Sequence, residues 1–150
     1  MSETREPITD YLAYLLANAH RNLHLQLEQQ LKAEGVQVEH WRVLEILRDQ
    51  RGRSMGELAG LVLMNHPALT KLVDRMVADG LVHRVPSPDD LRRVLVFITD
   101  RGMDLLERLK PRADGHNANI ARRLGKRDAA SLKRLLTSLI EETGPDGLRR

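Results

Sequence analysis

Two adjacent arginines stand in a short polar turn within the segment "SPDDLRRVLVFITDRG", residues 87–102. Arg92 and Arg93 directly follow a pair of aspartates, and a β-branched run comes after them. A guanidinium group that enters a narrow minor groove of DNA gains from the negative potential there. Asp90 could hold the stem of such a guanidinium and set its direction. The alternative is a solvated turn, whose surface ion pairs contribute little to stability.

A second candidate for nucleic-acid chemistry is the stretch that follows Asn65. The asparagine is a helix-capping residue and Pro67 suits the first turn, so a helix is predicted from here to Gly80. Its outward face is small or polar, which would allow close approach to the floor of a major groove. Lys71 and Arg75 suit guanine acceptors or phosphates. The alternative is an ordinary solvated helix face.

The helix before it also has a marked beginning. Ser54 and Glu57 have the spacing of a capping box, in which the hydroxyl accepts one free N–H and the glutamate reaches back to another. Together with the next helix and the arginine turn, this start defines the predicted DNA-contacting set. Its members are Ser54, His66, Pro67, Ala68, Thr70, Lys71, Arg75, Asp90, Arg92 and Arg93.

A separate group of residues could bind a small molecule. His20 and His24 are four residues apart on a predicted helix, and Trp41 and Arg42 begin the next one. Trp41 could stack on an aromatic ring, while Arg42 or a histidine could meet a carboxylate. Core packing is the alternative for Trp41, and a surface or interface position is the alternative for the histidines. These four residues are the predicted effector site.

Metal binding and catalysis are not predicted. The two histidines have the spacing of metal ligands, but the glutamate of the H-E-x-x-H motif is missing and no third ligand is evident from spacing. The chain has no cysteine, which excludes disulfides and thiolate sites. Phosphate loops, glycine-rich dinucleotide turns and a Ser-His-Asp order are also absent from the sequence. We therefore expect no cofactor and no enzyme activity.

Composition limits the class of protein. The chain has 150 residues, a formal net charge of +3 and a sequence pI of about 9.6. The positive charge mildly favours polyanions as partners. Aromatic residues are 3%, so we expect an aliphatic core and no stacking platform for RNA bases. No apolar run approaches the ~18 residues of a membrane span, and no export signal is indicated. A cytoplasmic protein that does not bind membranes is expected.

The periodicity of apolar residues predicts a mainly helical fold with one β-hairpin. Steps of three and four residues indicate helices, and the runs "LVHRV" and "RVLVFI" around a Pro-containing turn indicate the hairpin. The predicted helices span residues 8–33, 39–49, 54–63, 66–79, 99–124 and 126–142. This order is that of a winged helix-turn-helix. The apolar stripes of the first and the last two helices exceed what the small central module can cover, so a homodimer is predicted.

The segment "SMGELAGLVLMNHPALTKLVDRMVADGLVHRVPSPDDLRRVLVFITDRG" resembles the winged-helix core of MarR-type transcriptional regulators. Asp90-Leu91-Arg92 followed by Val96 is similar to the wing pattern D-x-R-x-x-x-V/I of that family. One departure is Leu91, where an arginine is common, and this leaves Arg92 as the main groove residue, with Arg93 as a substitute for the second contact. His66-Pro67 is a second departure, which would restrict what the reading helix recognises.

The resemblance implies a single MarR-like domain over residues 1–150. Its winged helix-turn-helix core would be residues 38–102, and residues 8–35 and 103–143 would form the dimerisation region. It implies a homodimer that binds a pseudo-palindromic operator in double-stranded DNA, usually as a repressor. A small aromatic carboxylate, or its coenzyme A thioester, would release it. The alternative function is a winged-helix protein–protein interaction module that does not bind DNA.

Overall fold

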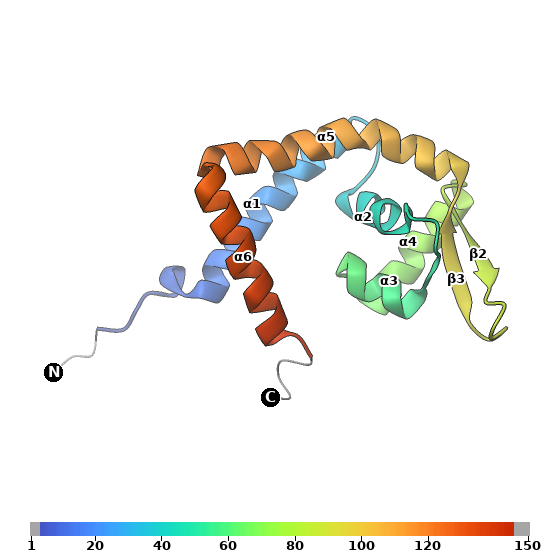
Figure 1. Cartoon of the computed structure of the whole chain (residues 1–150), viewed down its shortest axis with the longest axis horizontal. Helices are drawn as coiled ribbons and strands as arrows, with labels where there is room; N and C mark the ends of the chain where they lie inside the picture. The colour runs from blue at the N-terminus through green and yellow to red at the C-terminus, as the bar shows by residue number, and fades with distance from the viewer. Residues whose placement is uncertain (1–3, 146–150) are drawn as a thin grey trace. The chain divides into compact units, whose positions relative to one another are not determined.

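The computed structural model describes residues 4–145, and this range holds six α-helices, a short 3-10 helix and three short strands (Figure 1). The predicted mainly helical class with a β-hairpin is confirmed. The helices are α1 (Leu12–Lys32), α2 (Val38–Leu47), α3 (Met55–Val62), α4 (His66–Ala78), α5 (Asp100–Leu124) and α6 (Lys126–Thr143), after the 3-10 helix Ile8–Asp10. The strands are β1 (Arg53–Ser54), β2 (Val82–Pro86) and β3 (Val94–Ile98).

The chain forms two compact units that divide after Ala113, within α5. The first unit holds α1 to α4, the strands and the beginning of α5. The second holds the remainder of α5 and α6, which are separated by Gly125 at a φ of 89°. Among the described residues, none of the helices combines the length and apolar character that a membrane-spanning segment requires.

The turn between α3 and α4 is built by capping groups at both helix ends. Ser54 Oγ accepts the Glu57 N–H at 3.2 Å and begins α3. Leu63 ends that helix in the left-handed region at a φ of 63°, and Asn65 Oδ1 accepts the Ala68 N–H at 2.9 Å to begin α4. Both predicted starts are confirmed. The glutamate part of the capping box differs: Glu57 accepts the Ser54 hydroxyl at 3.1 Å instead of a backbone N–H.

The three strands form an antiparallel sheet in the order β1-β3-β2. The predicted hairpin pairs Val82 with Ile98 at its base and Pro86 with Val94 near its tip. Strand β1 was not predicted, because two residues are too short to show an alternating pattern. Gly52 directly before it has a φ of +73°, and a Cβ there would lie 2.5 Å from the Phe97 ring. A side chain at residue 52 would therefore displace the ring from the sheet.

A single aliphatic core fills the first unit. All four residues of the predicted buried stripe of α4 are in it: Leu69, Leu72, Val73 and Met76. The same core also contains leucines and valines of α1, α2, α3 and the hairpin, together with Leu105, Leu106 and Leu109 of α5. Trp41 is only partly buried and packs against this core.

The first turn of α5 is attached to the end of α4. Thr99 Oγ1 accepts the Gly102 N–H at 3.0 Å and donates its own proton to the Gly80 carbonyl at 2.6 Å. A Cβ on Gly102 would lie 2.3 Å from the Leu81 carbonyl oxygen, so only glycine allows this approach. The contact sets where the hairpin starts relative to α4, since Leu81 lies between them.

The apolar stripes of α1 and α6 are largely exposed. Only Leu27 and Leu31 of the long first stripe are buried. No residue of α6 is buried within the described chain. The exposed apolar side chains are Leu12, Tyr14, Leu15, Leu16 and Leu25 in α1 and Leu132, Leu135, Leu139 and Ile140 in α6, and Ile8 of the preceding 3-10 helix is exposed as well.

The start of α2 depends on a buried histidine. His40 is 7% exposed, and its Nδ1 accepts the Gln37 N–H at 3.3 Å. Burial is the main reason why the pKa of His40 lies below its ordinary value of 6.5, and Arg75 lowers this pKa further. Asp79 and Glu39 act in the opposite direction. The folded protein therefore favours the neutral imidazole, which is also the form that can accept the N–H.

A histidine with a lowered pKa makes folding depend on pH. Between the ordinary pKa and the lower native pKa, the unfolded chain binds a proton that the folded chain does not. We expect the free energy of unfolding to be highest above about pH 6.5 and to fall on acidification, by at most ~1.4 kcal/mol per pH unit from this residue. His40→Gln should reduce the slope of this decrease in urea denaturation measured at several pH values. The exposed His66→Gln should keep the slope, and an unchanged slope for His40→Gln would contradict the assignment.

Candidate nucleic-acid interface

The outward face of α4 is centred opposite its buried stripe. With about 100° per residue, Pro67, Lys71, Asp74 and Ala78 lie in the middle of this face, and all four are exposed. Ala68 and Arg75 lie on one flank, and Ala68 is partly buried. The remaining predicted contacts of the helix, His66 and Thr70, lie on the other flank and are exposed. The structure thus brings the predicted residues of α4 to one side of the helix.

The hydroxyl of Thr70 is partly used within the helix. Its Oγ1 donates to the His66 carbonyl at 3.0 Å. The methyl group and the acceptor lone pairs of Thr70 remain available to a base. This arrangement suits contact with a thymine methyl or with a base amino group.

Asp74 is neutralised by a residue of the hairpin. Arg84 on β2 forms an ion pair with Asp74, through Nη2 and Oδ1. A bare carboxylate at the centre of this face would repel DNA phosphates, and the ion pair with Arg84 removes most of that repulsion. Within α4 itself, Lys71 and Arg75 are the cations nearest to Asp74 in sequence, yet neither forms an ion pair with it within the described residues. Arg84 was missed because its closeness to Asp74 depends on how β2 packs beside α4.

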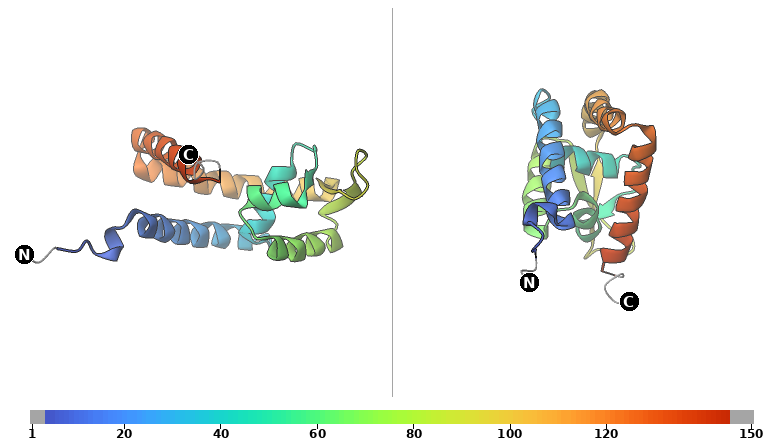
Figure 2. Two further views of the ribbon diagram at one scale, coloured as in Figure 1. Left: turned by 90° about the horizontal axis from the view of Figure 1, so that it is seen from below. Right: turned by 90° about the vertical axis from the view of Figure 1, so that its left-hand side faces the viewer.

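The loop between β2 and β3 lies at the end of the first unit that is away from the beginning of α1 (Figure 2), and Arg92 is a residue of this loop. Arg92 is exposed, and no residue within 4–145 bonds its guanidinium. Asp90 Oδ1 accepts the backbone N–H of Arg92 at 3.0 Å. Asp90 was expected to hold the guanidinium, but in this structure its carboxylate holds the backbone of the turn. The turn is therefore ordered while the side chain of Arg92 stays available.

Arg93 is arranged differently from its neighbour. Its Nη2 forms an ion pair with Glu57 Oε1 at the start of α3. The same Glu57 oxygen accepts the Ser54 hydroxyl. Ser54 and Arg93, both predicted as DNA contacts, thus share one carboxylate partner. Lys71, Arg75 and Arg92, by contrast, have no ion-pair partner within the described residues.

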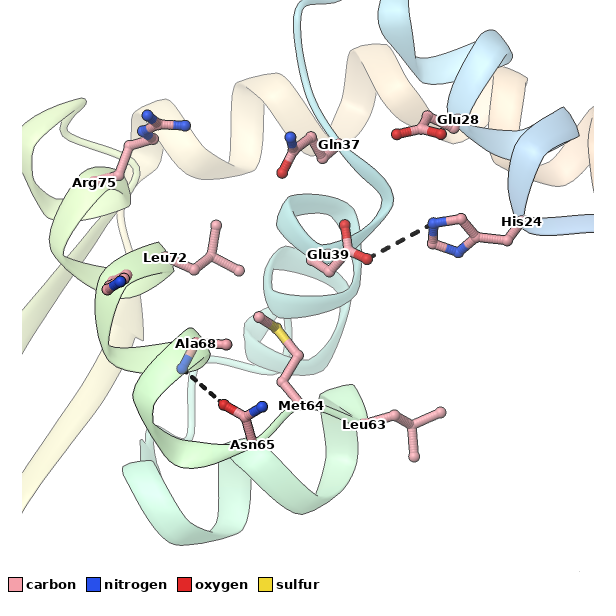
Figure 3. Close-up of a pocket in the computed structure, with 11 residues that line it drawn as sticks. His24, Glu28, Gln37, Glu39, Leu63, Met64, Asn65, Ala68, Leu72 and Arg75 are labelled. Carbon is pink, nitrogen blue, oxygen red and sulfur yellow. Dashed lines mark hydrogen bonds and ion pairs between the residues drawn. The ribbon is translucent and has the colours of Figure 1, made fainter. Parts of the chain in front are cut away.

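A pocket of about 700 Å³ lies next to the flank of α4 that carries Ala68 and Arg75 (Figure 3). Residues of α1, α2, the α3–α4 turn and α4 line it. They are His24, Glu28, Gln37, Glu39, Leu63, Met64, Asn65, Ala68, Lys71, Leu72 and Arg75. Ala68, Lys71 and Arg75 therefore belong both to the predicted DNA-contacting set and to the wall of this pocket.

Of the four residues predicted to bind an effector, His24 lines the pocket. Its Nε2 lies 3.8 Å from Glu39 Oε1, and its buried Nδ1 has no hydrogen-bond partner within residues 4–145 (Figure 3). His20 is exposed, with its ring centroid 5.6 Å from that of His24. Trp41 and Arg42 are partly buried and lie outside the lining of this pocket. Ala68, Lys71 and Arg75 of α4 also line the pocket, and the sequence had assigned them only to DNA contact.

The charges in the pocket are mixed. Glu28 and Glu39 face it from α1 and α2, and Lys71 and Arg75 face it from α4. Leu63, Met64 and Leu72 supply apolar surface. Such a site can hold a small molecule that combines an apolar ring with a charged or polar group. In the part of the chain that the structure describes, no group of three histidine or carboxylate side chains could hold a metal ion.

Taken together, a helix-turn-helix followed by a paired hairpin, with exposed cations on the second helix and at the hairpin tip, defines a winged helix-turn-helix protein. A sequence profile of the MarR family matches residues 34–93. The solved structure of the MarR family transcriptional regulator from Silicibacter pomeroyi is 36% identical, with a TM-score of 0.80. That comparison covers 91% of this chain and 98% of the other. The chain belongs to the MarR family, whose members regulate transcription and are not enzymes.

Two further relatives are informative. The HTH-type transcriptional repressor IacR from Pseudomonas putida is 37% identical over 101 residues, which are 67% of this chain and 60% of the repressor. The chain thus spans less than two thirds of that relative. The crystal structure of NadR in complex with 4-hydroxyphenylacetate matches this fold with a TM-score of 0.77. The two sequences are 26% identical, and the comparison covers 91% of this chain and 97% of NadR.

Proposed function

We propose that this protein is a cytoplasmic, sequence-specific DNA-binding repressor that acts as a homodimer on a pseudo-palindromic operator and is released by a small aromatic anion. The observation that carries the proposal is the distribution of charge on the winged core. Lys71 and Arg75 on α4 and Arg92 at the wing tip have no ion-pair partner within the described residues. Asp74, which would oppose DNA, is paired with Arg84. The residual charge on these elements is therefore positive.

Each reading element has its own groove in this proposal. The small residues Pro67 and Ala68 let the start of α4 approach the floor of the major groove, where Thr70 and Lys71 contact bases or phosphates. Arg92 enters the adjacent minor groove. His66 contributes at the first turn of α4. Binding depends on these few placed charges, because residues 65–102 hold six Lys or Arg against five Asp.

The homodimer is supported by the exposed apolar side chains of α1 and α6. Leu12 is 77% exposed and Leu135 is 56% exposed, and each lies in a row of further exposed leucines. Apolar stripes of this length are typical of surfaces that a second copy covers. A two-fold dimer would present two α4 helices at successive major grooves, about one helical turn of DNA apart.

The effector is proposed to occupy the pocket beside α4. Its volume of about 700 Å³ suits a single-ring aromatic acid. NadR, which shares the fold, was crystallised with the aromatic acid 4-hydroxyphenylacetate. The ring would contact Leu72 and Met64, and the carboxylate would meet Lys71, Arg75 or His24. An aromatic carboxylate in the form of its coenzyme A thioester remains within the proposal, since the same ring would enter the pocket.

The position of the pocket explains how an effector would release DNA. An anion that binds Lys71 and Arg75 withdraws their charge from the phosphates and bases. DNA and effector then favour different arrangements of the same two side chains, and the affinity for each is lowered by the other by the same factor. This coupling needs no long-range path, because both ligands contact α4.

The contribution of Arg92 can be tested by salt-dependent DNA binding. Arg92→Ala should weaken binding to duplexes from the protein's own promoter about tenfold, because each lost groove contact costs ~1–3 kcal/mol. The slope of log affinity against log salt should decrease by about one unit. Arg21→Ala on the exposed face of α1 removes the same charge and should leave both quantities nearly unchanged. Wild-type affinity and slope for Arg92→Ala would exclude the minor-groove contact and favour a protein-binding module.

The dimer is tested by a single charge in its proposed interface. Leu12→Glu should shift the mass measured by sedimentation equilibrium towards the monomer, because a carboxylate cannot be buried without a partner. Operator affinity should also decrease, because a monomer contacts only one half of the pseudo-palindromic operator. Leu61→Glu, at an exposed leucine of α3, should remain dimeric. A wild-type protein that is monomeric at micromolar concentration would contradict this part of the proposal.

The effector site is tested in the absence of DNA. We expect 4-hydroxyphenylacetate to change the fluorescence of Trp41, the only tryptophan, and to lower operator affinity. Lys71→Gln should weaken that fluorescence titration about tenfold, as expected for a charge-assisted bond worth ~1.5 kcal/mol. Lys133→Gln on α6 serves as the matched control. If neither this acid nor other aromatic carboxylates alter fluorescence or DNA binding, the ligand class is wrong.

A further inference from the structure

We propose that Arg93 is a positioning residue: its ion pair with Glu57 holds the wing against α3, so that Arg92 is presented to the minor groove. This replaces the expectation that Arg93 itself contacts DNA, and it rests on the proposed DNA-binding function. The two adjacent arginines would then have different roles. Arg93 would position the wing through its ion pair with Glu57, which we call the brace, and Arg92 would contact DNA.

Arg93 is bonded at three points within the winged core. Its side chain pairs with Glu57, which also accepts the Ser54 hydroxyl at 3.1 Å. Its backbone N–H donates to the Asp90 carbonyl at 2.9 Å, and its carbonyl accepts the Ser87 N–H at 2.7 Å. Arg93 thus closes the wing loop through its backbone and joins the loop to α3 through its side chain.

Arg92 has no comparable attachment of its side chain. Only its backbone N–H is held, by Asp90 Oδ1 at 3.0 Å. Arg92 lies in the turn that the Arg93 N–H closes by donating to the Asp90 carbonyl, and Arg93 lies directly before β3. The guanidinium of Arg93 is used by α3, whereas the guanidinium of Arg92 is exposed and makes no bond within the described residues.

The other strand of the wing has an equivalent attachment. Arg84 on β2 pairs with Asp74 on α4. Each strand of the wing is therefore tied by one arginine to one helix of the helix-turn-helix, Arg93 to α3 and Arg84 to α4. The reading helix and the wing must meet two neighbouring grooves at once, and these two ion pairs restrict the movement of the hairpin relative to the helices beyond what core packing provides.

The Arg93–Glu57 pair is too exposed to be important for folding. Its side chains are 53% and 49% exposed, and exposed pairs contribute little to global stability. A small free energy still changes the fraction of molecules whose wing is correctly placed. Only that fraction binds the operator without a further conformational cost. We expect loss of the brace to weaken DNA binding about twofold to fivefold, in line with the modest coupling of such pairs.

Glu57→Gln is the decisive variant. A purely electrostatic role and a positioning role of Glu57 predict changes of operator affinity in opposite directions. Removing a negative charge from a DNA-facing surface strengthens binding if electrostatic attraction alone matters. If Glu57 acts as a brace, the same change weakens operator binding. Arg93→Ala should weaken it to a similar extent, and the double variant should be no weaker than either single one. Arg93→Lys keeps a cation and should restore part of the affinity.

Two controls separate the brace from general effects. Asp89→Asn removes an exposed carboxylate of the wing that has no bond to any described residue, and it should bind DNA as tightly as the wild type or more tightly. In addition, Arg92→Ala should cost less in the Glu57→Gln background than in the wild type, because a misplaced wing uses Arg92 less. The melting temperatures of the Glu57, Arg93 and Asp89 variants should agree with that of the wild type within about 2 °C, which shows that the fold is intact.

Hydrogen exchange tests the brace without DNA. The amides of Ser87 and Arg93, which close the wing loop, should exchange several times faster in Glu57→Gln than in the wild type or in Asp89→Asn. The positioning role of Arg93 is contradicted if the exchange rates of Glu57→Gln are unchanged, or if its operator affinity equals or exceeds that of the wild type. Either result leaves the proposed DNA-binding function intact. If the slope of log affinity against log salt decreased by about one unit in Arg93→Ala, Arg93 would instead be a residue that contacts a phosphate. If the wild-type protein binds no duplex, the proposed function fails, and the exchange measurement alone decides the brace.

Discussion

A carboxylate near DNA repels the phosphates, and two carboxylates of the winged core are paired with arginines of the hairpin and its loop. Positive and negative side chains of the core are almost equal in number, so affinity for a polyanion gains from each acid that is paired, although Asp89 has no such partner among the described residues. Asp74 pairs with Arg84 and Glu57 pairs with Arg93. The cations that remain without a partner in the described structure stand where a groove reader needs them. The same pairs also connect the hairpin to both helices, so charge neutralisation and geometry come from the same contacts.

The flank of α4 that borders the pocket is where the proposed DNA site and the proposed effector site meet. Lys71 and Arg75 lie on an outward-facing helix and also line a cavity of about 700 Å³. An effector and an operator would compete for these side chains even if the backbone of α4 did not move. Close enough to Arg75 to have its pKa lowered by that charge, His40 accepts the Gln37 N–H at the start of α2. The surface that would read DNA is therefore next to both a ligand cavity and a buried titratable group.

Much of the fold could be predicted because its signals are local. The caps at Ser54 and Asn65, the glycines that end helices and the hairpin runs were correct to within a few residues. Strand β1 was missed, since two residues carry no pattern. The partners of the charged residues were also missed. Glu57 and Arg93 are 36 positions apart, and nothing in the spacing of the sequence indicates that they meet.

The sequence by itself determined the class of fold, the helix-turn-helix, the β-hairpin and the surplus of apolar surface on α1 and α6. These features depend on periodicity and capping, which act over three or four residues. Only the tertiary structure decided which arginine of the wing is paired and which is free, that Asp90 holds backbone instead of guanidinium, and that Lys71 and Arg75 line a pocket. Ion pairing and cavity formation depend on distances between segments remote in the chain, and those distances exist only once the core has packed.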